Sequence, residues 1–286
     1  MSEVFDTTPC QLGEGPLWHP ARGQFFWFDI TNGRLLTQET GKTRIVQFDE
    51  MVSAAGWVDD TSLLIASETR FFHFDLETER REDVEGLEAD NPVTRSNDGR
   101  ADPWGGFWIG TMGKNAEAGA GSIYRYYDGR VTQLFENIRV SNAICFSPDR
   151  KYAYYTDTPT EQVMRQALEP DRGWPDGEPE VWLAPGTDGF HPDGAVVDAA
   201  GNFWNAQWGA ARVDVFGPDA SFLKSVSFNA AHTSCPAFGG ADLSTLFCTS
   251  ARQGLSADEL ENGMQHGMTF AQPEAGKGQA EHRVKL

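Results

Sequence analysis

The sequence predicts an all-β protein, a six-bladed β-propeller with four-stranded antiparallel blades. Three observations lead to this prediction: a hairpin-like segment recurs six times, helical periodicity is weak, and 30 Gly and 15 Pro residues punctuate the chain. Each recurring segment has a short apolar strand, a tight turn and a second strand rich in Phe, Trp, Tyr or Leu. The segments begin at Gly15, Ala54, Asn97, Asn142, Asp193 and Phe238.

The turns inside these segments follow known chemistry. The Asp side chain forms a hydrogen bond with the backbone two residues later, Pro fixes φ, and Gly tolerates positive φ. These residues therefore let the two strands fold back as a hairpin. The hairpins recur at intervals of roughly 40 to 50 residues, the spacing of propeller blades. Strand-like sequence with its own turn follows at 122–135 and 211–226 and supplies the outer strands of a blade. The acidic stretch 77–90 is interpreted as a solvated outer strand and loop.

A single propeller domain over residues 1–286 accounts for the whole chain, because no shift in composition marks a boundary. A propeller must pair its first and last blades, since an open ring would expose sheet edges. We therefore expect the N-terminal segment, about residues 3–9, to pair with a strand near 267–271. The closed ring leaves few exposed edges, which favours a monomer.

Composition and charge narrow the classes of function. The formal net charge of −19 opposes binding to nucleic acid or to an anionic membrane surface. No apolar run is long enough to span a bilayer, and the N-terminus lacks the pattern of a secretory signal, so we expect a cytoplasmic protein. The four cysteines show no CxxC spacing and are expected to be free buried thiols: Cys10, Cys145, Cys235 and Cys248. The expected partner is a small neutral molecule or a cation.

Polar residues recur where four of the repeats enter their first strand: Glu14, Asn97, Asn142 and Asp193. Each one alone is explained as a turn, a strand end or a surface acid, but turn chemistry does not require that all four share one phase of the repeat. The first strands line the central channel, so these side chains should converge at one mouth. Two carboxylates there would repel each other without a counter-ion, so we predict a cation bound by Glu14, Asn142 and Asp193.

An all-oxygen ligand set suits one hard divalent ion. Ca²⁺ is expected first, with Mg²⁺, Mn²⁺ and Zn²⁺ as alternatives. Such an ion in an open site suits carbonyl chemistry, in which Asp193 can act as the general base that takes the proton of a bound water. Arg95 would lie beside the ion as a donor to an oxyanion or to hydroxyl groups. His191 could contact the site, but a loop residue is the favoured interpretation.

No competing catalytic motif is visible. The sequence has no GxSxG elbow, no P-loop, no GxGxxG after a first strand and no HExxH. A serine hydrolase is therefore disfavoured.

The sequence resembles the regucalcin (senescence marker protein)/gluconolactonase family of six-bladed propellers. The matching stretches run in order through the chain: LGEGPLW at 12–18, RSNDGRADPWGGFWIGTM at 95–112, SNAICFSPDRKYAYYTD at 141–157, PDGAVVDAAGNFWNAQWG at 192–209 and FGGADLSTLFCTSAR at 238–252. The resemblance implies a metal-dependent lactonase acting on sugar-acid (aldono-) lactones. It places metal ligands at Glu14, Asn142 and Asp193, substrate contacts at Arg95 and Asn97, and the general base at Asp193.

The chain departs from the family pattern at three places. Ser96 stands where a bulky residue is frequent, and Ala143 stands where Gly is common. Lys114 and Asn115 occupy the region where some members have a Glu that contacts substrate, so the resemblance does not indicate which sugar is preferred.

Two other functions stay open at this point. The same ion could serve hydrolysis of another ester or of a phosphotriester, or the chain could be a calcium-binding or protein-interaction propeller without turnover. An Arg and an Asn facing the channel favour an enzyme, because a purely structural ion needs neither.

Overall fold

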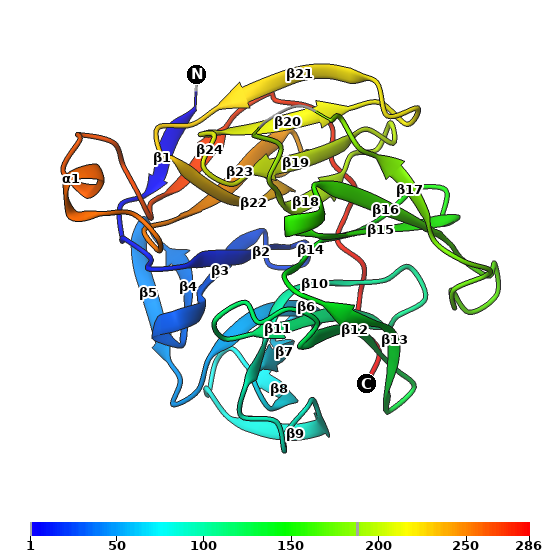
Figure 1. Cartoon of the computed structure of the whole chain (residues 1–286). Coiled ribbons are helices and arrows are strands. Elements are labelled where there is room, and N and C mark those ends of the chain that lie inside the picture. Colours follow the sequence, from blue (N-terminus) through cyan, green and yellow to red (C-terminus); the bar gives the residue numbers. More distant parts are fainter. Residues whose placement is uncertain (1, 187–188) are drawn as a thin grey trace.

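The structure is a computed structural model that describes residues 2–186 and 189–286, and it confirms the predicted six-bladed β-propeller (Figure 1). Six sheets of four antiparallel strands stand around a central channel. Blade 1 contains β2 (Gly13–His19), β3 (Gln24–Asp29), β4 (Arg34–Glu39) and β5 (Lys42–Gln47). Blade 2 contains β6 (Val52–Asp59), β7 (Ser62–Ser67), β8 (Arg70–Asp75) and β9 (Arg81–Gly86). Blade 3 contains β10 (Thr94–Ala101), β11 (Phe107–Gly113), β12 (Gly121–Tyr127) and β13 (Arg130–Ile138).

The remaining blades follow the same order, from the channel outward. Blade 4 contains β14 (Ser141–Phe146), β15 (Tyr152–Asp157), β16 (Gln162–Ala167) and β17 (Glu180–Leu183). Blade 5 contains β18 (Pro192–Val197), β19 (Phe203–Gln207), β20 (Arg212–Phe216) and β21 (Phe222–Ser227). Blade 6 contains β22 (His232–Gly239), β23 (Thr245–Ala251), β24 (Thr269–Gln272) and β1 (Glu3–Asp6). The inner strands β2, β6, β10, β14, β18 and β22 pack against one another in a ring and line the channel.

The expected hairpins and outer strands are all present, including β9 within the acidic stretch. The ring closes as predicted, because β1 from the N-terminus pairs with β24, with Val4 opposite Phe270. One short helix, α1 (Ala257–Leu260), lies in the connection between β23 and β24. Within the described residues, no helix has the length and apolar character needed to cross a bilayer.

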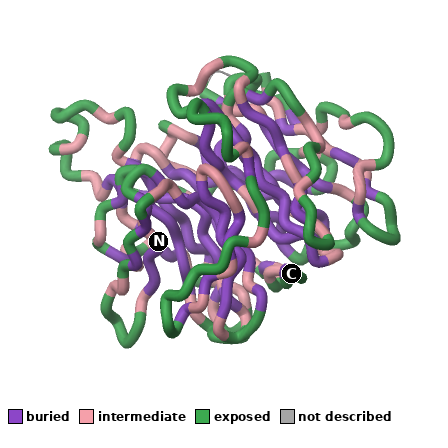
Figure 2. Tube along the Cα trace, turned by 90° about the horizontal axis from the view of Figure 1, so that it is seen from below, coloured by how far each residue is buried: buried purple, intermediate pink, exposed green. Residues whose placement is uncertain are grey.

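The core lies between the blades rather than inside the channel. In β3 the run Phe25, Phe26, Trp27, Phe28 is buried along its whole length, because alternate side chains face opposite neighbours. Phe26 and Phe28 pack toward blade 2, whereas Phe25 and Trp27 pack toward blade 6. Figure 2 shows the result, with buried residues along the strands and exposed residues in the peripheral loops. All four cysteines are free and buried, as predicted.

After β24 the chain leaves the blades. Residues 273–286 run back across the ring in an extended path, drawn in red in Figure 1. This segment contacts the ends of the inner strands, whereas the predicted site residues lie at the starts of those strands. The two mouths of the channel are therefore different: one is open, and the other is crossed by the C-terminal segment.

Candidate metal and substrate site

A register irregularity interrupts each inner hairpin near the start of the inner strand. In blades 1, 4 and 5 it falls between Glu14 and Leu17, between Asn142 and Cys145, and between Pro192 and Ala195. A bulge of this kind places an unpaired residue in the strand and redirects its side chain. The repeated bulge therefore explains why polar side chains at one phase of the repeat meet at one mouth.

Backbone conformation at these bulges restricts the neighbouring residues. Gly15 has a φ of 53°, and a Cβ added there would lie 2.1 Å from the carbonyl oxygen of Ser53. The glycine after Glu14 is thus required by a close approach of blade 2. Ala143 has a φ of 58°, a left-handed conformation that explains why the resembling family commonly has Gly at this position.

The structure brings all five predicted site residues into one cavity of about 220 Å³. They are Glu14, Arg95, Asn97, Asn142 and Asp193, and each is at most 5 % exposed. The rest of the lining is largely apolar and comprises Leu12, Met112, Ala116, Val140, Thr158, Trp208 and Gln253. A cavity with a few convergent polar groups and an apolar wall is typical of a small-molecule site.

A chain of hydrogen bonds orders the polar side of the cavity. Arg95 Nη1 donates to Asn97 Oδ1 at 2.7 Å, and Asn97 Nδ2 donates to Asn142 Oδ1 at 2.9 Å. Asn142 Nδ2 then donates to Thr158 Oγ1 at 2.9 Å, and that hydroxyl donates to the carbonyl oxygen of Pro192 at 2.7 Å. The chain links blades 3, 4 and 5 and fixes the orientation of both amides, so that the Asn142 carbonyl oxygen is held in place.

The backbone of Asp193 is anchored separately. Asn205 Nδ2 donates to the carbonyl oxygens of Asp193 and Gly194 at 2.9 and 3.1 Å. Gln207 Nε2 in turn donates to Asn205 Oδ1 at 2.7 Å. The second strand of blade 5 therefore holds the backbone of Asp193. The Asp193 carboxylate is not needed to anchor the residue.

Burial changes the proton affinity of the charged groups. Burial, followed by the charge of Asp98, raises the pKa of Glu14 to about 8. The pKa of Asp193 lies well above its usual value, because of burial first and then the charges of Glu14 and Asp98. Burial also lowers the pKa of Arg95 to about 10. Two poorly solvated carboxylates thus repel each other, and Arg95 is the cation that acts on both.

The donor chemistry fits a hard divalent cation. Glu14 and Asp193 supply two carboxylates, and Asn142 Oδ1 keeps a second lone pair beyond the bond from Asn97. In the part of the chain that the structure describes, no three His, Cys, Asp or Glu side chains gather around one point, so the amide oxygen is needed as the third donor. Asp98 is engaged elsewhere, because its Oδ2 accepts a hydrogen bond from the Ile144 amide at 2.7 Å.

Three polar residues near the site in sequence do not line the cavity: His191, Lys114 and Asn115. His191 is exposed, and its Nδ1 lies 3.7 Å from Glu161 Oε1, which agrees with the favoured interpretation as a loop residue. Lys114 Nζ pairs with Glu68 Oε2 at 2.5 Å, and Asn115 Nδ2 donates to Glu117 Oε1 at 3.0 Å. Neither Lys114 nor Asn115 lines the cavity.

Sequence reasoning missed three features of the site. Asp98 lies in a turn-like Asn-Asp-Gly sequence, which carries no prediction for its side chain, although its carboxylate is buried and burial raises its pKa to about 6. Thr158 follows β15, and could have been found because the second strand of a hairpin returns to the mouth where the first begins. Trp208 lines the cavity and stacks on His232, with ring centroids 4.1 Å apart and planes 18° apart.

Comparisons with known proteins agree with this architecture. The family model described as "SMP-30/Gluconolactonase/LRE-like region" matches residues 12–252. A putative sugar lactone lactonase of Rhizobium meliloti is 41 % identical over 278 residues, which cover 96 % of this chain and 94 % of that protein. A 6-deoxy-6-sulfogluconolactonase of Pseudomonas putida is 34 % identical over 270 residues, which cover 92 % of this chain and 91 % of that protein.

A solved structure is also similar over the full length. The crystal structure of a calcium-binding protein, regucalcin, from Agrobacterium tumefaciens has a TM-score of 0.97 and 41 % identity, and covers 100 % of this chain and 98 % of that chain. The resemblance predicted from the sequence motifs is confirmed. The chain belongs to the SMP-30/gluconolactonase/LRE-like family.

Proposed function

We propose that this protein is a lactonase that hydrolyses a sugar-acid (aldono-) lactone to the open aldonic acid with the help of one divalent metal ion. The observation that carries the proposal is the pair of buried carboxylates, Glu14 and Asp193, that face a small-molecule cavity without a matching number of cations. The relatives named lactonases support the reaction type, and the calcium-binding regucalcin supports a metal, with Ca²⁺ as the first candidate.

Glu14, Asn142 and Asp193 would hold the ion. When bound, it would supply Lewis-acid polarisation of the lactone carbonyl and a lowered pKa for water. It would also supply the missing positive charge, so that both carboxylates stay ionised at neutral pH.

In the proposed reaction a water oxygen attacks the carbonyl carbon of the lactone. Asp193 accepts the proton that this water loses, as general base. The bond between the carbonyl carbon and the ring oxygen then breaks, and the ring oxygen takes up the proton held by Asp193 to become a hydroxyl group, which returns Asp193 to its carboxylate form. The anchored backbone of Asp193 keeps its carboxylate in position through these steps.

Arg95 and Asn97 would bind the substrate and stabilise the developing oxyanion. Arg95 is a fixed positive donor, because its Nη1 is already held by Asn97 Oδ1 and by the carbonyl oxygen of Ser96. Asn97 Nδ2 is engaged with Asn142 and with the Ser141 carbonyl oxygen. Asn97 would therefore accept a hydrogen bond from a sugar hydroxyl with its amide oxygen rather than donate one.

Trp208 would form the opposite wall. Its indole is held by the stack on His232, and its backbone is held by the bond from the Trp208 amide to the His191 carbonyl oxygen at 3.0 Å. A flat apolar surface of this kind suits the C–H face of a sugar ring, while Arg95 and Asn97 face its hydroxyl groups.

The proposal is tested by lactone hydrolysis followed with a pH indicator. Chelator-stripped protein is assayed with and without Ca²⁺, Mg²⁺, Mn²⁺ and Zn²⁺ on gluconolactone, galactonolactone, xylonolactone and arabinonolactone, with spontaneous opening subtracted. Recovery of turnover with a metal supports the proposal, and the order of rates identifies the sugar and the ion. If the ion binds but no lactone is hydrolysed, another ester or phosphotriester, or a binding function, becomes the better account.

A further inference from the structure

The C-terminal strap, residues 273–286, crosses the channel mouth opposite the candidate site. Backbone hydrogen bonds attach it to four blades: Gly278 N to Leu243 O at 2.8 Å, Ala199 N to Lys277 O at 2.8 Å, Lys285 N to Gly105 O at 2.8 Å and Val284 N to Trp57 O at 2.9 Å. Val284 is 1 % exposed and packs beside Gly56 and Phe107. The strap is therefore a built part of the propeller and not a loose terminus.

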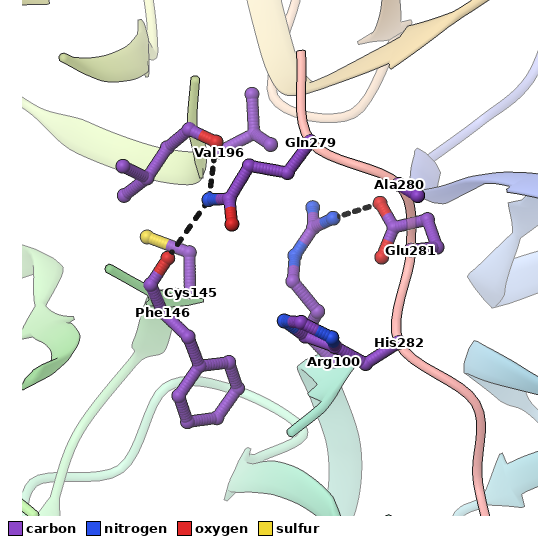
Figure 3. Close-up of a pocket in the computed structure, with 9 residues that line it drawn as sticks. Arg100, Cys145, Phe146, Val196, Gln279, Ala280, Glu281 and His282 are labelled. Atoms are coloured by element: carbon purple, nitrogen blue, oxygen red, sulfur yellow. Dashed lines mark hydrogen bonds and ion pairs between the residues drawn. The ribbon is translucent and has the colours of Figure 1, made fainter. Parts of the chain in front are cut away.

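Two strap side chains reach inward, as Figure 3 shows. Gln279 Nε2 donates to the carbonyl oxygens of Phe146 and Val197 at 3.1 and 2.8 Å, which joins the inner strands of blades 4 and 5. Glu281 forms an ion pair with Arg100, and the two side chains are 8 % and 10 % exposed. Only about 20 Å³ of free space remains around these groups, enough for about one water molecule.

Arg100 connects the strap to the strands that carry the site. It lies on β10, which also carries Arg95 and Asn97, and its Nη2 donates to the Ala195 carbonyl oxygen at 3.3 Å. Ala195 is two residues beyond Asp193 on β18. The guanidinium thus links β10 to β18, the inner strands that carry Arg95, Asn97 and Asp193.

The charged side chains between the strap and the site also interact electrostatically. The charge of Arg100 acts on Asp98, and the charge of Asp98 acts on both Glu14 and Asp193. Four buried carboxylates lie along the channel, those of Glu14, Asp98, Asp193 and Glu281. They are accompanied by two guanidinium groups, those of Arg95 and Arg100. When all six groups are ionised, the difference is two negative charges, which is the charge that one divalent ion neutralises.

We propose that Glu281 is a positioning residue for the metal site: it neutralises and holds Arg100, so that this guanidinium does not offset the carboxylates that bind the ion. The C-terminal strap thereby sets the affinity of the opposite mouth for a divalent cation. The inference rests on the metal site of the proposed function, and it adds a residue that neither lines that cavity nor touches substrate.

Opposite effects of two substitutions test this inference. Calorimetric titration with Ca²⁺ alone measures the affinity. Glu281→Gln keeps the shape of the side chain but removes its charge, and it should weaken Ca²⁺ binding by roughly tenfold. This is the lower end of the losses seen when residues that support a metal site are replaced. Arg100→Gln should bind Ca²⁺ at least as tightly as the wild type, because it removes positive charge near the site. A pair that acts only as a structural clamp predicts the same direction for both variants, and that result would overturn the proposal.

Two further variants serve as controls. Gln279→Ala removes the neutral strap contacts and should lower thermal stability without changing Ca²⁺ affinity. Arg100→Gln with Glu281→Gln removes both charges and should bind Ca²⁺ as the wild type does. If Glu281→Gln does not fold, Arg100→Gln and the double variant keep the proposal testable, because without Arg100 the charge of Glu281 is no longer needed; weaker Ca²⁺ binding than the wild type in either variant would contradict the proposal.

The wild-type titration separates the two proposals. If the wild type binds no Ca²⁺, Mg²⁺, Mn²⁺ or Zn²⁺, the proposed function and this inference both fail. If it binds an ion and the variants do not differ as stated, only the role of Glu281 fails.

Discussion

The two mouths of the channel contain the same kinds of charged side chain and use them differently. At the strap-covered mouth Arg100 and Glu281 neutralise each other, and about 20 Å³ of space is left. At the open mouth Glu14 and Asp193 share one nearby cation, Arg95, beside a cavity of about 220 Å³. Buried charge that is paired within the chain calls for no ligand, whereas buried charge that is left unpaired beside a cavity indicates one.

The largest expected effect comes from removing one of the unpaired charges. Asp193→Asn should lower kcat/KM for the best aldonolactone by roughly 10³-fold or more, because a general base and a metal ligand are lost together. Steady-state kinetics at the metal concentration that saturates the wild type measures the loss, and circular dichroism checks the fold. Asp214→Asn is a matched control, since Asp214 is a buried acid of the same blade that contacts Arg212 and Ser225 outside the cavity. A full rate in Asp193→Asn would refute the assignment.

The pH dependence of stability tests whether the open mouth lacks a counter-ion. In metal-free protein the pKa of Glu14 is raised from 4.5 to about 8, so between these values the folded state binds more protons than the unfolded state. The free energy of unfolding should therefore fall as pH rises from about 4.5 to about 8, by up to about 1.4 kcal/mol per pH unit from this group.

Thermal denaturation of chelator-stripped protein between pH 5 and 8 measures this slope. Glu14→Gln should flatten it, and saturating Ca²⁺ should oppose it, because the ion binds the ionised carboxylates. The same slope in Glu14→Gln would show that Glu14 is not the group responsible.

The apolar wall of the open mouth should affect substrate binding more than metal binding. Trp208→Ala should raise KM for the preferred sugar lactone by about tenfold through the loss of the aromatic surface, and leave Ca²⁺ affinity unchanged. Trp208→Phe keeps an aromatic face and should be affected less. An unchanged KM in Trp208→Ala would remove this residue from the proposed substrate wall.

The smallest effect is expected at the closed mouth. Gln279→Ala leaves the carbonyl oxygens of Phe146 and Val197 without this donor and should cost about 1 to 2 kcal/mol of stability. The corresponding fall in Tm is a few degrees, roughly 2–4 °C per kcal/mol in a domain of this size class. Differential scanning calorimetry measures it. A fall in lactonase rate without a fall in Tm would mean that this contact acts on the site and not on the fold.

The fold could be predicted because its signals are local and repeated. Turn residues, alternating aromatic strands and the need to cover sheet edges are enough to predict the blades and the pairing of β1 with β24. The cluster of Glu14, Asn97, Asn142 and Asp193 could be predicted because a shared phase in a closed repeat places residues together in space.

The remaining features depend on contacts that no repeat encodes. Residues 273–286 lie outside the repeats, and Glu281 meets Arg100 across 181 positions of the chain. Asp98 occupies an ordinary turn-like Asn-Asp-Gly sequence, and its burial follows only from the bulge that turns β10 into the channel. Trp208 lies after a strand where an aromatic residue is equally typical of packing between blades.

The central claim is that the unpaired carboxylates of the open mouth form a divalent-metal site. Its most direct test is calorimetric titration of chelator-stripped wild-type protein and of Asp193→Asn with Ca²⁺ at pH 7, in two buffers that differ in ionisation enthalpy. The account predicts one ion per chain in the wild type, proton release on binding because the pKa of Glu14 is about 8 beforehand, and no saturable binding in Asp193→Asn. Equal binding by both proteins, or no binding of Ca²⁺, Mg²⁺, Mn²⁺ or Zn²⁺ by the wild type, would contradict it.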